Sequence, residues 1–291
     1  MPLHIACDRT SLEIVKLLTQ NSPAYVLDAA QDNGDTPLDR ACRRTCPEIV
    51  HFLLSQGSSV FVDEDQKQGP LLNAVLNKVE YAISIVSMLL DAGANINHRD
   101  KFRNTALLYA AQLSALELHA EELSSVGTAF TGYLGWREKC SKIDLIMLLI
   151  ERGSDVNAVG VGSRCALHWA VISTQENLVR KLIVSGCDLD KRDDHGLIPL
   201  CYACQKGSKV LVDILIISGA DLRAQNWEVF VRNFEDETTN ELLNYVIHES
   251  KKCLDLKYLC YRLLRKKLRH LEKDASHLGL PQFLIKCLLL K

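Results

Sequence analysis

The sequence predicts an all-α chain, a solenoid of stacked helix pairs followed by a short helical segment at the C-terminus. Three observations support this prediction: a short phrase that recurs with a spacing near 33 residues, a glycine that closes five of its six copies, and a leucine-rich final segment. A period of 20–50 residues is typical of repeat proteins, in which each repeat buries its apolar face only by stacking on its neighbours. A hydrophobic content of 47% and a charged content of 24% are ordinary for a globular chain of 291 residues.

The recurring phrase marks the first helix of each repeat. Its second position, usually proline, falls at residues 2, 37, 70, 106, 166 and 199, which gives spacings of 35, 33, 36, 60 and 33. Proline at the first helical position costs no hydrogen bond and presets the backbone. Alanine four residues later allows neighbouring helices to approach closely. Aliphatic residues at helical spacing, as in residues 48–54, predict the second helix.

The closing glycine predicts where each second helix ends, because glycine readily adopts the left-handed conformation that terminates a helix. It follows the phrase by 20 residues in the second, fifth and sixth repeats, by 23 in the third and by 47 in the fourth. Both insertions therefore lie between the two helices of a repeat. The larger, about residues 112–139, starts with a helical pattern and then becomes rich in glycine and aromatic residues. It is either a recognition loop or a tolerated surface insertion whose aromatic side chains pack on the scaffold.

A period near 33 with the pattern Thr-Pro-Leu-His-x-Ala resembles the ankyrin repeat. The resemblance covers about six repeats over residues 1–222, with a degenerate continuation to about residue 248. His4 and His168 occupy the histidine position of the repeat, where the side chain bonds to the adjoining turn. Residues 227–234 and 239–247 are expected to form a last helix pair, with Thr238 or Thr239 as its N-cap. Met1 stands where the repeat has threonine, so further repeats are expected upstream.

The C-terminal segment carries the second resemblance. Residues 254–290 hold fourteen leucine and isoleucine residues, and Leu256, Cys260 and Leu264 are spaced to share one stripe of a helix. So small a segment buries too little surface to be stable alone. Its pattern resembles the SOCS box, and the whole chain is similar to the ankyrin-repeat and SOCS-box family, with an ankyrin domain over residues 1–248 and the box over 249–291.

The resemblance implies partners for this box. In the family its first element binds the elongin B–elongin C pair, and its second element selects a cullin-5 scaffold with a RING subunit. Gly279 and Cys287 depart from the family pattern, at a proline and a tyrosine position. The matching elongin-binding residues here are Leu256, Leu259, Cys260, Leu263 and Leu264. The matching cullin-binding residues are Leu278, Leu280, Pro281, Leu284 and Leu288.

The resemblance implies a non-catalytic substrate receptor of a cullin–RING ubiquitin ligase, whose ankyrin surface holds a protein target. By position, the turn tips and the ends of the first helices would contact that target. The alternative is a scaffold or signalling adaptor whose C-terminal helices only cap the array or bind calmodulin, because residues 257–273 are strongly basic. The residues expected to contact the target are Asp32, Asn33, Asp35, Arg43, Arg44, Lys101, Phe102, Asn104, Asp194, His195, Gln205 and Lys206.

Enzymatic chemistry is not predicted. Cys201 and Cys204 form a CxxC pair without a second pair at zinc-ligand spacing, and they fall in a repeat phrase, so we expect them to be packing residues. We expect no metal, no cofactor and no active site. A net charge of −2 gives no global attraction to nucleic acid or membrane, and no apolar run has the length of a membrane span. Without a secretion signal, the expected location is the cytoplasm, with the nucleus as an open alternative.

Overall fold

The computed structural model describes residues 1–20, 23–32, 34–61, 68–76, 79–118, 142–227 and 237–251. These residues are helical and contain no β-strand. The chain divides into two compact units, residues 1–155 and residues 156–291. The prediction of an all-helical repeat fold is thus confirmed for the part of the chain that the structure describes.

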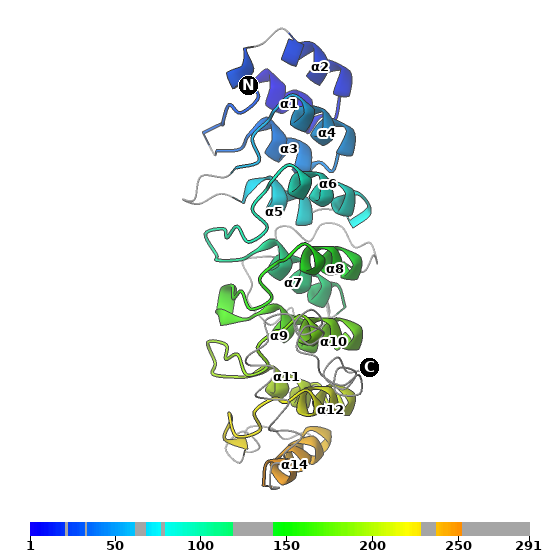
Figure 1. Cartoon of the computed structure of the whole chain (residues 1–291), viewed down its shortest axis with the longest axis vertical. Helices are drawn as coiled ribbons and strands as arrows, with labels where there is room; N and C mark the ends of the chain where they lie inside the picture. Colours follow the sequence, from blue (N-terminus) through cyan, green and yellow to red (C-terminus); the bar gives the residue numbers. More distant parts are fainter. Residues whose placement is uncertain are drawn as a thin grey trace, which may run out of the picture. The chain divides into compact units, whose positions relative to one another are not determined.

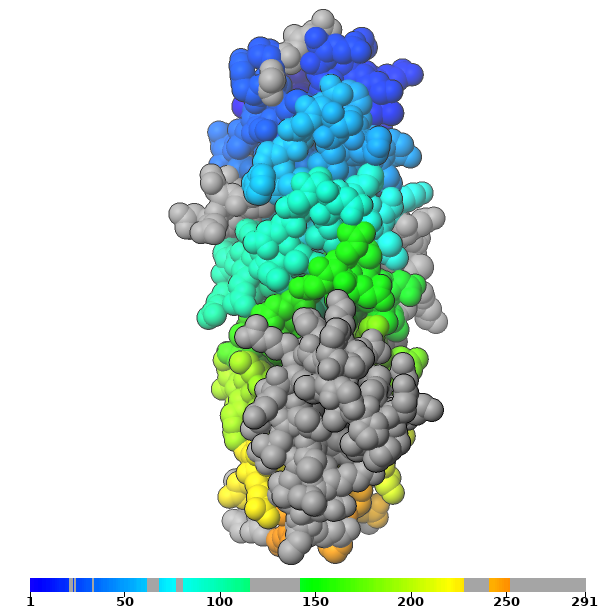
Figure 2. Space-filling view, in the orientation of Figure 1, coloured from blue at the N-terminus to red at the C-terminus, as the bar shows by residue number. Residues whose placement is uncertain are grey.

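The N-terminal unit contains four consecutive helix pairs (Figure 1). Each pair forms a hairpin, the first helices pack in one row, and the second helices pack in a parallel row behind them. The space-filling view shows the pairs of this unit lying directly against one another, from blue to cyan (Figure 2). The first helices are α1 (Pro2–Asp8), α3 (Pro37–Arg43), α5 (Gly69–Val75) and α7 (Ala106–Leu118), and the second helices are α2 (Leu12–Gln20), α4 (Pro47–Ser55), α6 (Val79–Asp91) and α8 (Ile143–Glu151).

The C-terminal unit repeats the same arrangement. Helix α9 packs on α11 and helix α10 on α12, while α14 packs against α11. The helices are α9 (Ala166–Ile172), α10 (Glu176–Val184), α11 (Pro199–Gln205), α12 (Lys209–Ile217) and α14 (Glu237–Lys251). Short 3-10 helices occur at Ala24–Val26 in the first unit and Val161–Ser163 in the second.

The predicted helix ends are found where the sequence places them. Proline is the first or second residue of five of the described helices, and the glycine that closes the second helix in the second to sixth repeats has a positive φ, for example +89° at Gly57 and +91° at Gly153. A Cβ atom at either glycine would meet nothing within 4 Å. The backbone conformation, and not a lack of space, therefore favours glycine at these ends.

Side chain–backbone hydrogen bonds keep consecutive repeats in register. The Ser59 N–H donates to Asp28 Oδ1 at 2.8 Å, and the Asp155 N–H donates to Asn97 Oδ1 at 2.8 Å. The first bond spans 31 residues and the second 58, a difference of 27. This is the excess length of the fourth repeat, 47 minus 20 residues. The insertion thus lengthens the chain between α7 and α8 without changing the contact between the repeats on either side.

The start of the insertion differs from the prediction. Helix α7 has 13 residues, where the other first helices have seven, and Gln112, Leu113, Ser114 and Ala115 are buried. No glycine or proline interrupts this segment, so the helix continues by about two turns past the usual end. Residues 112–118 belong to the scaffold, and the glycine-rich remainder of the predicted insertion lies outside the described residues.

The predicted N-cap of the last helix is wrong. Helix α14 begins at Glu237, so Thr238 and Thr239 lie inside its first turn. The helix also runs to Lys251, through the predicted domain boundary after residue 248.

The turn between the two helices of a repeat requires a left-handed residue. Gly207 fills this position in one repeat with φ +64°, but Thr10, Thr45 and Thr174 fill it in three others with φ between +54° and +57°. A β-branched residue is disfavoured in this conformation. Threonine therefore stores strain at a position where glycine would be relaxed.

We expect Thr174→Gly to raise the free energy of unfolding of the C-terminal unit by about 1 kcal/mol, since the strain relieved exceeds the added entropy of the unfolded chain. Urea unfolding followed by tryptophan fluorescence measures this in a Trp136→Phe background, because the two remaining tryptophans, Trp169 and Trp227, both lie in that unit and are buried. The reciprocal variant Gly207→Thr should destabilise by a similar amount. Equal stability of all three proteins would contradict this explanation.

The first repeat exposes a face that the other repeats bury. Ile14 in α2 is 50% exposed, whereas residues at the same position of later second helices are 1% or less exposed (Ile49 and Leu178). Ile5 and Leu17 are also exposed, at 56% and 60%. A repeat that stacks on only one neighbour leaves its other apolar face in contact with solvent.

None of the helices in the described ranges has the length and apolar character needed to cross a membrane.

Candidate protein-binding surface

The turns between consecutive helix pairs, which we call fingers, are held by buried aspartates. Asp100 Oδ1 accepts hydrogen bonds from the N–H groups of Phe102 and Asn104, both at 2.9 Å, and Tyr109 Oη donates to Asp100 Oδ2. Burial, followed by the contact with Asp100, raises the pKa of Tyr109, so its hydroxyl remains a donor. The finger at residues 100–104 is therefore fixed from its base.

The finger at residues 193–197 is built in the same way. Asp193 Oδ1 accepts from the N–H groups of His195 and Leu197 at 2.9 Å, and Tyr202 Oη donates to Asp193 Oδ2 at 2.6 Å. Burial opposes ionisation of Asp193, but the Tyr202 and backbone hydrogen bonds outweigh it and lower the pKa of this carboxyl. Both fingers thus present their tip side chains from a rigid turn.

The arginine pair of the second repeat is occupied within the chain. The Arg43 guanidinium donates to both carboxylate oxygens of Asp35, at 2.9 and 3.1 Å, and Arg44 donates to both oxygens of Asp8, at 2.9 and 3.0 Å. Arg40 lies 3.1 Å from Asp35 as well. The hydrogen bond from Arg44 holds the pKa of Asp8 below its ordinary value. The Arg44–Asp8 pair links the first two repeats, whereas the Arg43–Asp35 pair lies within the second. A partner would have to compete with both pairs for the arginines.

Beneath this pair lies a buried polar contact between α3 and α5. Asp39 accepts from the Thr36 N–H and hydroxyl at 2.9 Å, and Asn73 Nδ2 donates to Asp39 Oδ1 at 3.0 Å. Burial raises the pKa of Asp39, although these hydrogen bonds oppose the shift. Arg43 Nη2 also donates to Asn73 Oδ1, at 3.4 Å. Arg43 is therefore part of the packing between repeats.

Arg164 is the residue on this surface that sequence reasoning missed. Its guanidinium lies 5.3 Å from the Trp169 ring centroid and 5.4 Å from that of Tyr202. It also donates to Tyr202 Oη at 3.0 Å and lies 3.5 Å from Asp193 Oδ2. Arg164 precedes the repeat phrase by one residue, at the position of Asp35 and Asn104. That shared position is the signal that could have identified it.

The remaining predicted contact residues differ in burial, and one lies outside the described residues. Asn104 is 3% exposed, so it has too little surface to meet a partner, and we withdraw it from the predicted set. Gln205 and Lys206 are half-buried at the end of α11, whereas Asp32, Lys101, Phe102, Asp194 and His195 are exposed. Asn33 and all ten residues predicted to bind elongin and cullin lie outside the described residues.

The histidine position of the repeat has the predicted structural role. His4 Nε2 lies 3.0 Å from the Asp35 carbonyl oxygen, and His168 Nε2 lies 3.4 Å from that of Leu197. His168 Nδ1 accepts from the Cys165 N–H at 3.2 Å, so the proton of the neutral ring is on Nε2. Each histidine therefore ties the start of a first helix to the finger of the next repeat.

Cys165 and His168 could be mistaken for a catalytic pair, because Sγ and Nδ1 are 3.1 Å apart. Both residues are at most 1% exposed. Burial raises the pKa of the Cys165 thiol and lowers the pKa of His168 to about 4, so both are neutral at pH 7. A nucleophilic cysteine needs the opposite shifts, which would favour thiolate and imidazolium. The pair caps and packs α9.

The CxxC cysteines are also buried. Cys201 and Cys204 are 0% exposed, and burial raises the pKa of each thiol to about 12. Cys187 is buried as well. Across the described residues, no group of three or more histidine, cysteine, aspartate or glutamate side chains is placed to hold a metal ion.

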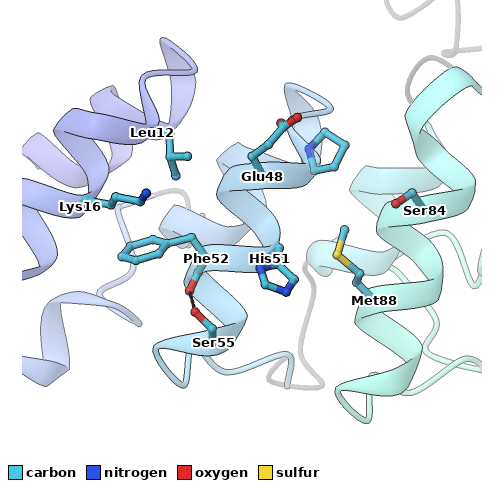
Figure 3. Close-up of a pocket in the computed structure, with 9 residues that line it drawn as sticks. Leu12, Lys16, Glu48, His51, Phe52, Ser55, Ser84 and Met88 are labelled. Carbon is cyan, nitrogen blue, oxygen red and sulfur yellow. Dashed lines mark hydrogen bonds between the residues drawn. The ribbon is translucent and has the colours of Figure 1, made fainter.

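A groove crosses the second helices of the N-terminal unit (Figure 3). Its volume is about 510 Å³, and the aromatic ring of Phe52 and the thioether of Met88 provide apolar walls. Lys16 Nζ lies 6.0 Å from the Phe52 ring centroid. This groove was not predicted from the sequence, because it forms only when α2, α4 and α6 stack. The groove is lined by Leu12, Lys16, Pro47, Glu48, His51, Phe52, Ser55, Ser84 and Met88.

Comparison with known proteins agrees with this architecture. Residues 1–64 and 138–226 match a family model of ankyrin repeats in three copies. The structure is similar to the crystal structure of an ankyrin repeat domain from Acinetobacter baumannii, with a TM-score of 0.57 and 21% sequence identity over 74% of this chain and 96% of that chain. No curated protein matches the sequence. Because the family model covers more than half of its residues, the chain belongs to the ankyrin-repeat family.

Proposed function

We propose that this chain is the non-catalytic substrate receptor of an elongin–cullin–SOCS-box ubiquitin ligase. The observation that carries the proposal is the order of its parts, an ankyrin array followed by the leucine–cysteine stripe and the leucine–proline element of residues 256–288. Ankyrin-repeat proteins are generally non-catalytic scaffolds for protein binding, which supplies the target-binding half of this function. The cytoplasm is the expected location, with the nucleus as an alternative.

The ankyrin array and the C-terminal segment would bind different partners. Fingers and first helices would bind the target, while Leu256, Cys260 and Leu264 would anchor elongin C. Tethering a target beside a ligase raises its effective concentration and limits its orientation, so ubiquitin transfer would accelerate without an active site in this chain. Gly279 and Cys287, which replace residues of the family pattern, should weaken the cullin contact more than the elongin contact.

Quantitative affinity purification from cells tests this function. The bait is the full chain, with and without a proteasome inhibitor, beside the variant Leu256→Pro/Cys260→Phe. Proline breaks the predicted helix and phenylalanine overfills the cysteine position. We expect elongin C to be recovered with the wild type only. We also expect at least one further protein that carries ubiquitin and accumulates under the inhibitor with the wild-type bait, but not with the double variant.

The second candidate is an ankyrin adaptor whose C-terminal helices only cap the array or bind calmodulin. The observation that favours it is the charge of residues 257–273, where seven lysines and arginines stand against a single acid, Glu272. This candidate predicts calcium-dependent recovery of calmodulin in the same purification and no elongin C with either protein.

A further inference from the structure

The tip of the finger at residues 100–104 combines one aromatic and two basic side chains. Lys101, Phe102 and Arg103 are consecutive and all exposed, with 43% of Phe102 accessible to solvent. Lys101 Nζ lies 5.0 Å from the Phe102 ring centroid. Within the described part of the chain, neither Lys101 nor Arg103 forms an ion pair with an acidic side chain. Their charges are thus available to a partner.

The finger is already ordered without a partner. Asp100 fixes the turn through the N–H groups of Phe102 and Asn104, and the Arg103 N–H donates to the Asp100 carbonyl oxygen at 2.8 Å. Tyr109 holds the other oxygen of Asp100 from within the repeat. A ligand that binds this tip would lose less free energy to ordering the loop than one that binds a mobile loop.

Arg103 occupies a conformation that the fingers before α3 and α11 give to glycine, and the finger before α9 has Ser163 there with φ +54°. The φ of Arg103 is +63°, and the glycines at the same position are Gly34 with +78° and Gly196 with +72°. A strained residue persists where the surrounding structure fixes it, and such residues concentrate at functional sites. Here the strained residue also adds a positive charge to the tip. Packing alone does not explain why arginine rather than glycine stands at this position, because the Arg103 side chain is exposed.

The charge of this tip is opposite to that of the fingers before α3 and α11. Lys101 aligns with Asp32 in the finger before α3 and with Asp194 in the finger before α11. Two positive charges beside an aromatic ring are complementary to carboxylates beside an apolar side chain. Aromatic and arginine residues also dominate the binding energy of protein interfaces.

We propose that the tip formed by Lys101, Phe102 and Arg103 binds an acidic segment of a protein ligand, with an apolar side chain of that segment packed on Phe102. The inference deepens the target-binding half of the proposed function and rests on it, but does not depend on elongin or cullin. Binding should weaken as ionic strength rises, because exposed charges are screened by salt.

The test is selection of a random twelve-residue peptide library on the purified full chain. We expect the selected peptides to be enriched in aspartate and glutamate around one aromatic or aliphatic residue. Lys101→Glu/Arg103→Glu and Phe102→Ala should each weaken the best peptide by about tenfold or more. The charge-matched variant Arg9→Glu/Arg223→Glu, which changes exposed arginines elsewhere, should bind like the wild type.

Arg103→Gly separates a binding role from a structural one. It relieves the backbone, so the protein should remain folded and gain stability, yet it should bind the peptide less tightly by about threefold to tenfold. The proposal is overturned if no acidic peptides are selected, if Lys101→Glu/Arg103→Glu binds them unchanged, or if both charge-matched variants weaken them equally. Formation of the elongin complex in that case would show that the proposed function survives without this inference.

Discussion

Lowering the pH from 7.5 to 5 should cost the C-terminal unit about 2 kcal/mol of stability through His168 alone. The pKa of His168 in the folded chain is about 4, because burial of the ring opposes the charged form. An unfolded histidine titrates near pH 6.5. As the pH falls, the unfolded state therefore binds a proton before the folded state does. The contribution of neutral His168 to the free energy of unfolding is complete above pH 6.5 and is lost progressively as the pH falls towards 4.

The measurement is urea unfolding of the full chain at pH 7.5 and pH 5, followed by tryptophan fluorescence in a Trp136→Phe background, where both remaining tryptophans lie in the C-terminal unit. His168→Asn keeps an acceptor for the Cys165 N–H but has no ionisable ring. It should be less stable than the wild type at pH 7.5 and should lose about 2 kcal/mol less on acidification. If both proteins lose the same stability, His168 is not neutral and buried in solution.

Equivalent residues of the first and second repeats should differ several-fold in their effect on stability. Ile49→Ala should destabilise the N-terminal unit by about 3 kcal/mol, since Ile49 is 1% exposed and its removal leaves a cavity between repeats. Ile14→Ala, at the same position of the first repeat, should cost about 1 kcal/mol, because half of this side chain is already in water.

Loss of helical circular dichroism in urea measures both variants, and the two substitutions remove the same atoms. Equal destabilisation would mean that Ile14 is covered in solution, either by self-association or by another part of the chain. In that case dilution should separate the two explanations, since only self-association depends on protein concentration.

The repeat phrase was sufficient to predict most of the scaffold because each of its residues has a local task. Proline at helix starts, glycine with positive φ at helix ends and His168 bound to the next finger all follow from their own position in the phrase. Helix α7 was harder, because nothing in residues 112–118 signals an end and the burial of residues 112–115 depends on the rest of the repeat.

The binding surface was predicted less well, because exposure depends on neighbours that are distant in sequence. Arg43 and Arg44 are of a residue type that is common in binding sites. However, their guanidinium groups are hydrogen-bonded to Asp35 and Asp8, and Asp8 lies 36 residues from Arg44. Asn104 is buried beside a finger whose tip is exposed. The groove at Phe52 and Met88 needs three stacked helices, so no single repeat encodes it.

Direct binding of elongin tests the central claim most closely. The full chain is co-expressed with elongin B and elongin C, and the purified material is weighed by native mass spectrometry. We expect the wild type to form a complex that contains one copy of each protein. The variant Leu256→Pro/Cys260→Phe should form no such complex, although its ankyrin array should be folded as in the wild type. Absence of the wild-type complex, or its persistence in the double variant, would contradict the proposal that the Leu256 and Cys260 stripe binds elongin C.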